Sequence, residues 1–132
     1  MDKQINTVVY YHANCADGFM AAFCIWMKYS QFGENEISGM EFIPVNYGYK
    51  PDIDFLKDKL VYVVGFSFDP EVMKSIMEVA NIVWLDHHKT SIEAWNAYKL
   101  SLGVGWVGWN ENNVIVHDTT KSGAMLAWEH IW

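Results

Sequence analysis

Apolar residues gather along the chain in five short runs whose length and composition are typical of β-strands. Most of these runs are rich in β-branched and aromatic residues, which favours buried strands. The run from 40 to 46 is weaker and contains Pro44, which cannot donate a hydrogen bond to a sheet, so we expect it at an edge. The expected strands cover residues 5–12, 40–46, 60–68, 81–85 and 114–118.

Between the strands, apolar positions recur every three or four residues, as on one face of a helix. Asp69 and Pro70 are suited to the N-cap and first position of one such helix. The remaining segments predict a polar loop over 33–39 and an irregular Gly- and Trp-rich stretch over 101–113. The expected helices cover 18–30, 69–80, 91–100 and 122–132, with a short one opening at Pro51.

Strands that alternate with helices predict an α/β fold with a mostly parallel sheet. The chain has 132 residues, the size of one domain, and 52% of them are hydrophobic, which is enough for a core. We therefore expect one three-layer domain over 1–132, with a five-stranded, mostly parallel sheet and helices on both faces. Trp26, Trp84 and Trp128 are expected to fill its core.

The charge and the cysteines narrow the classes of partner and compartment. The net charge of −7 argues against binding long nucleic acid, which needs a basic surface. No apolar stretch is long enough to cross a membrane, and the N-terminus lacks the pattern of a signal peptide. Cys15 and Cys24 are not in a CxxC pattern, so we expect free thiols in the cytoplasm.

Histidine and aspartate follow the expected strands at their carboxyl ends, where ligands bind in parallel sheets. Loops are polar in general, which explains aspartate and serine there but not histidine. Four of the five histidines lie at these ends: His12, His87, His88 and His117. Such side chains predict a Mn²⁺ or Zn²⁺ site, and carboxylates favour Mn²⁺ or Mg²⁺. His117 alternates with Asp118 along a strand, so we do not expect both to be ligands.

Four segments in order resemble the motifs of the DHH phosphoesterases, most closely a short, often phage-encoded branch. The resemblance covers almost the whole chain and implies a Mn²⁺-dependent phosphodiesterase that acts on short oligonucleotides, cyclic dinucleotides or single-strand ends. The matching segments are YYHANCADGF (10–19), VYVVGFSF (61–68), VWLDHHKT (83–90) and HDTTKSGAMLAW (117–128).

The resemblance implies a role for each matching residue. Asp86 would be a metal ligand or would orient the histidines that follow it, and His88 would face the scissile phosphate. Lys89 would lie near the phosphates, together with Ser122 and Gly123, where a helix N-terminus could offer backbone N–H groups. The remaining residues implied as metal ligands are His12, Asp17, His87 and Asp118.

The chain departs from the family pattern at Gly65, where the family carries an Asp that bridges two metals. Losing this carboxylate should weaken one metal position and lower the activity. Cys15 stands where other branches carry an acid; it could ligate a metal as a thiolate, but we expect it to be a buried bystander. The sequence fits either a binder descended from an enzyme or an engineered inactive form.

The family also commonly carries a second, substrate-gripping domain, and no such domain follows Trp132. We therefore expect a cleft that is open or closed by a partner chain, with a homodimer preferred. Trp106 and Trp109 could serve as a lid and stack on bases. Two alternatives to the enzyme are a nucleotide-sequestering protein of phage origin that does not cleave, and a structural assembly protein.

Overall fold

The sheet contains five parallel strands in the order β2-β1-β3-β4-β5. The computed structural model describes residues 5–103 and 113–132, so Trp106 and Trp109 lie outside the described residues. The edge position of the strand with Pro44 is confirmed, because β2 pairs only with β1. The strands are β1 (Thr7–His12), β2 (Met40–Val45), β3 (Leu60–Val64), β4 (Asn81–Asp86) and β5 (Val114–His117).

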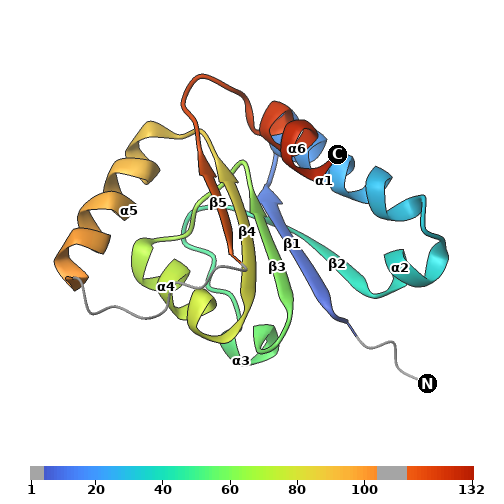
Figure 1. Ribbon diagram of the computed structural model, residues 1–132, viewed down its shortest axis with the longest axis horizontal. Coiled ribbons are helices and arrows are strands. Elements are labelled where there is room, and N and C mark those ends of the chain that lie inside the picture. Colours follow the sequence, from blue (N-terminus) through green and yellow to red (C-terminus); the bar gives the residue numbers. More distant parts are fainter. Residues whose placement is uncertain (1–4, 104–112) are drawn as a thin grey trace.

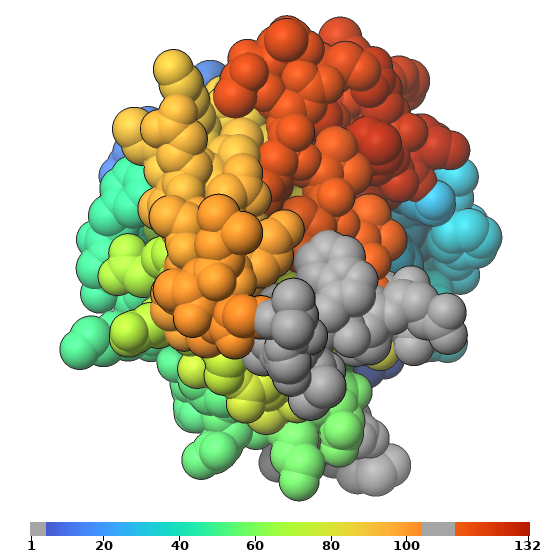
Figure 2. Space-filling view, turned by 60° about the vertical axis from the view of Figure 1, so that its left-hand side comes forward, coloured from blue at the N-terminus to red at the C-terminus, as the bar shows by residue number. Residues whose placement is uncertain are grey.

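Helices cover both faces of the sheet, which confirms the single three-layer α/β domain (Figure 1). Helices α1 and α6 lie side by side on one face, and α4 and α5 lie on the other. Figure 2 shows the outer surface of α5 beside the segment that leads from β5 into α6. The helices are α1 (Ala16–Ser30), α2 (Glu34–Ser38), α3 (Ile53–Leu56), α4 (Pro70–Val79), α5 (Lys89–Leu102) and α6 (Gly123–Ile131).

Alternation along the strands divides the core into two halves. In β1, Val8 and Tyr10 pack with the residues of α4, whereas Val9 packs with α1 and α6. The same period of two sends Val63 of β3 to the α4 side and Val64 to the α1 side. Because both faces are covered, these strands are apolar at nearly every position, which made them recognisable in the sequence.

Some element boundaries differ from those that the sequence predicted. Residues 34–38 form the short helix α2 rather than a loop. Strand β3 ends at Val64 rather than at residue 68, because Gly65 turns the backbone to a φ of +63°. Helix α5 begins at Lys89, directly after the two histidines, instead of at residue 91. The polar site is therefore closer to a helix start than expected.

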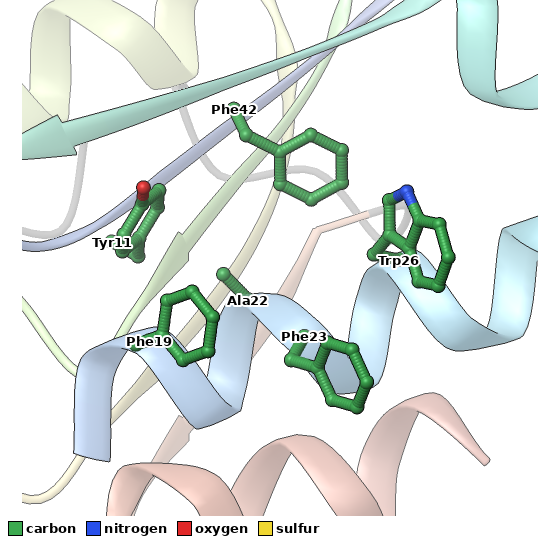
Figure 3. Close-up of a pocket in the computed structure, with 6 residues that line it drawn as sticks. All are labelled: Tyr11, Phe19, Ala22, Phe23, Trp26 and Phe42. Atoms are coloured by element: carbon green, nitrogen blue, oxygen red, sulfur yellow. The ribbon is translucent and has the colours of Figure 1, made fainter. Parts of the chain in front are cut away.

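The aromatic residues of α1 are exposed, which corrects part of the predicted core. The helix packs on the sheet through small residues such as Ala21, so Phe19 and Trp26 stay 59% and 43% exposed. They line an apolar groove of about 280 Å³ with Tyr11 and Phe42 (Figure 3). Trp128 is also exposed, at 52%, whereas Trp84 is in the core as predicted.

Candidate functional site

The carboxyl ends of the five strands meet at one edge of the sheet (Figure 1). Strand β1 lies between β2 and β3, so the strand order changes direction at β1. Open parallel sheets bind ligands at such a point. His12 ends β1, Gly65 follows β3 and Asp86 ends β4. The topology thus brings the first three predicted motifs to the same edge.

Asp86 is fully buried, and both of its carboxylate oxygens accept hydrogen bonds. Its Oδ1 accepts from the backbone N–H of His87 at 2.7 Å and from Nδ1 of His88 at 2.8 Å. Its Oδ2 accepts from the hydroxyl of Ser67, whose oxygen accepts from Nε1 of Trp84 at 3.0 Å. Of the two roles that the resemblance allowed, this geometry favours orienting the histidines over ligating a metal.

The bond to Asp86 fixes the tautomer of His88. An ionised carboxylate only accepts hydrogen bonds, so Nδ1 of His88 carries the proton and Nε2 keeps a lone pair. The ring of His88 lies 4.3 Å from that of His87 and 6.3 Å from that of His12, measured between centroids. Three imidazoles thus gather at this edge from the ends of β1 and β4, between which β3 lies.

Asp17 connects this cluster to helix α6. Its Oδ2 accepts from the N–H of Gly123 at 2.8 Å, and its Oδ1 accepts from the N–H of Ala124 at 2.9 Å. The same Oδ2 lies 3.4 Å from Nε2 of His87. The N–H groups that the sequence suggested for a phosphate are therefore bonded to a carboxylate of the chain, and Ser122 caps α6 by accepting from Met125 at 3.1 Å.

Two glycines, Gly18 and Gly123, allow the segments around Asp17 to approach one another closely. A Cβ on Gly18 would lie 2.5 Å from the carbonyl oxygen of His12, and one on Gly123 would lie 2.8 Å from Oδ2 of Asp17. A Cβ on Gly65 would meet only Gly18, at 3.7 Å. Sequence reasoning missed the packing role of Gly18; the signal was a glycine placed directly after a candidate ligand.

Three other predicted residues lie apart from the histidines or at the rim. The carboxylate of Asp118 accepts from the N–H and the hydroxyl of Thr120 at 2.9 and 2.5 Å, and these bonds lower its pKa. Lys89 is exposed and lies 3.8 Å from Glu93. Cys15 is a half-buried free thiol at the N-cap of α1.

The donors at this edge fit one borderline cation. Ligand atoms of Asp86, His87 and His88 lie within 4.8 Å of one another. Nδ1 of His12 is buried and has no hydrogen-bond partner among the described residues, as expected of a nitrogen placed for another ligand. Imidazoles with a carboxylate suit Mn²⁺ or Zn²⁺ better than Mg²⁺. Gly65, where the resemblance implied a bridging carboxylate, supplies no ligand side chain.

Comparisons with known proteins yielded one distant relative. No family model matches the chain, and no solved structure matches it. An uncharacterized protein of Acanthamoeba polyphaga mimivirus is 28% identical over 134 residues, which span 95% of this chain and 29% of that protein. The chain thus spans under a third of the length of this relative. Among the described residues, no helix is long and apolar enough to cross a membrane.

Proposed function

We propose that this protein is a metal-dependent phosphodiesterase of the DHH type that hydrolyses a short oligonucleotide or cyclic nucleotide. The observation that carries the proposal is the orientation of His88 by the buried Asp86, next to His87 and Asp17 at the switch point of the sheet. Fully bonded buried carboxylates of this kind are typical of sites where an imidazole must present one nitrogen.

His12, Asp17 and His87 would hold the cation, for which Mn²⁺ is our first choice and Mg²⁺ the second. Bound there, the cation would lower the pKa of a water molecule and screen the charge of a phosphate. His88, whose Nδ1 is held by Asp86, would contact a phosphate oxygen through Nε2. Lys89, at the start of α5, adds a positive charge at the rim.

The second candidate is a protein that binds and sequesters a nucleotide, in a phage context, without cleaving it. Gly65 favours it, because the position that would carry the bridging carboxylate has none. An Asp at this position has room for its Cβ but must adopt a φ of +63°. That conformation costs an ordinary side chain about 1–2 kcal/mol, and less for Asp or Asn.

The two candidates are separated by incubating the protein with Mn²⁺ and a panel of linear and cyclic oligonucleotides and analysing the products by chromatography. Gly65→Asp is compared with Gly65→Asn, which has the same shape and backbone requirement but no charge. His87→Ala is compared with His130→Ala, which removes an exposed histidine of α6. The phosphodiesterase predicts hydrolysis by the wild type or by Gly65→Asp, lost in His87→Ala and kept in His130→Ala. If neither the wild type nor Gly65→Asp hydrolyses a nucleotide, but one is retained intact by the protein, the result favours the sequestering protein.

We also propose that the protein works in the cytoplasm, since both cysteines are free thiols, and that it forms a homodimer. Analytical ultracentrifugation tests the dimer. A sedimentation coefficient of a single 15.3 kDa chain at all concentrations would contradict it.

A further inference from the structure

A small hollow lies beside the histidines, on the side of β2. Tyr47 to Lys50, which follow β2, and Phe66 to Asp69, which follow β3, line a cavity of about 90 Å³ together with Val72. Its nearest wall adjoins the site, because the ring of His12 lies 5.8 Å from that of Tyr47 and 5.7 Å from that of Phe66. The hollow is too small for a nucleotide but can hold the edge of a base.

The walls of the hollow are aromatic and firmly supported. Phe66 and Phe68 are buried, and their rings pack 5.1 Å apart. Tyr47 leans on Phe66 at 5.0 Å, yet it is 62% exposed, so much of its ring is open to a ligand. An open aromatic ring on a rigid apolar floor is a suitable stacking surface for a base.

The charged groups of the hollow are one carboxylate and one ammonium, both on exposed residues. Asp69 is the N-cap residue of α4, but its side chain makes no capping hydrogen bond. The N–H groups of Val72 and Met73 instead donate to its backbone oxygen. The carboxylate is therefore free to accept from a ligand, and Lys50 supplies a donor in the same hollow.

This pair matches guanine better than adenine or cytosine. Along one edge, guanine presents the O6 acceptor beside the N1–H and N2–H donors, so a lysine can meet O6 while a carboxylate accepts both N–H groups. Adenine and cytosine each place a ring-nitrogen acceptor next to a single amino group, and that acceptor would face the carboxylate. A ring-nitrogen acceptor that faces the carboxylate repels it and leaves a hydrogen bond unmade, which lowers affinity.

We propose that this hollow is a guanine subsite, which stacks the base on Tyr47 and holds its edge on Asp69 and Lys50. The subsite rests on the proposed function, in that the phosphate of the same nucleotide would lie at His12 and His88. It narrows the substrate class to nucleotides with a guanine next to the scissile phosphate.

Isothermal titration calorimetry in Mn²⁺ buffer tests the subsite with guanosine 5′-monophosphate, adenosine 5′-monophosphate and ribose 5-phosphate. We expect the wild type to prefer the guanosine nucleotide by roughly tenfold, the discrimination of one good two-bond contact to a base. Asp69→Asn, which keeps a good N-cap residue, should remove most of that preference. Tyr47→Ala should lower the affinity for both nucleotides by about tenfold, whereas Tyr47→Phe should bind both with the affinity of the wild type.

Two exposed residues outside the hollow serve as controls, and Phe32→Ala and Asp54→Asn should bind as the wild type does. Equal affinity for the two nucleotides, or equally tight binding of ribose 5-phosphate, would overturn the subsite. Hydrolysis without base preference would also overturn it and leave the phosphodiesterase intact. Guanine-dependent binding without any hydrolysis supports the subsite and removes the phosphodiesterase.

Discussion

Oδ1 of Asp86 accepts a hydrogen bond from Nδ1–H of His88 at 2.8 Å, across only one intervening residue. The same oxygen also accepts the N–H of His87 at 2.7 Å. The carboxylate of Asp86 thus holds the segment between β4 and α5 in place and sets the direction of the His88 ring. An Asp-His-His sequence at a strand end therefore has a structural meaning as well as a chemical one.

Asp86→Asn should weaken Mn²⁺ binding by roughly 10- to 100-fold, the usual effect of altering a group that orients a ligand. Asn keeps the shape and one acceptor oxygen, but it removes the charge that strengthens the hydrogen bonds to the N–H of His87, a proposed ligand, and to Nδ1 of His88. Calorimetric titration with Mn²⁺ measures the change, and ¹⁵N NMR of the imidazoles reports the tautomer of His88 independently of metal.

The exposed Asp54→Asn is the matched control, and it should bind Mn²⁺ like the wild type. Unchanged Mn²⁺ affinity in Asp86→Asn would show that His88 and its neighbours do not depend on this carboxylate. A wild type that binds no Mn²⁺ would count against the proposed phosphodiesterase itself.

Ser67→Ala should lower the free energy of unfolding by about 1–3 kcal/mol, the cost of leaving buried polar groups without partners. The hydroxyl of Ser67 donates to Asp86 and accepts from Nε1 of Trp84 at 3.0 Å, and all three residues are buried. Urea denaturation gives the difference. Ser75→Ala removes an exposed hydroxyl that only bonds within α4, so it should change stability far less; equal losses would contradict the buried network.

Much of the architecture followed from the sequence for simple physical reasons. Strands that are covered on both faces must be apolar throughout, and Asp69-Pro70 marks a helix start by its backbone preferences. Helix α1 was harder, because its aromatic residues are not those that are buried against the sheet. Spacing alone could not show that Ala21 and Gly18 would face inward while Phe19 and Trp26 stayed exposed.

The sequence predicted which residues lie at the site better than it predicted the hydrogen bonds that they make. The sequence placed His12, His87 and Asp86 at one edge, since parallel strands bring their carboxyl ends together. It did not show that Asp17 would bond to the N-terminus of α6, because that contact joins residues 106 positions apart. Nor did it show Asp118 bonded to Thr120, which depends on one local turn.

His117 should make the stability depend on pH in the mildly acidic range. Burial lowers its pKa below the ordinary value of 6.5, with a smaller opposing effect from Asp86 and a lowering one from Lys99. The unfolded chain therefore binds a proton near pH 6.5 while the folded protein does not, so stability is full above this pH and falls as the pH drops through this range. Its Nε2 is buried with no hydrogen-bond partner among the described residues.

Urea denaturation in the presence of a chelator measures this dependence. It is carried out between about pH 8 and pH 5, a range that spans the ordinary histidine pKa of roughly 6.5. His117→Phe keeps a ring against Trp84, whose centroid lies 4.4 Å from that of His117, and should flatten the slope. His130→Gln removes an exposed histidine and should leave the slope as in the wild type. If the pH dependence of stability persists in His117→Phe, it arises from other titratable groups.

Gly18→Ala should destabilise the protein, although the same change usually stabilises a helix by up to about 1 kcal/mol. Here the new Cβ would lie 2.5 Å from the carbonyl oxygen of His12, a backbone atom that cannot move without disturbing β1. Overpacking of this kind costs about 1–3 kcal/mol, so the clash outweighs the helix preference. Ser30→Ala near the end of the same helix, whose hydroxyl bonds only to Met27, is the control for helix propensity. Thermal and urea unfolding of both variants decide the point, and a Gly18→Ala variant as stable as the wild type would mean that α1 is not packed this closely on the end of β1.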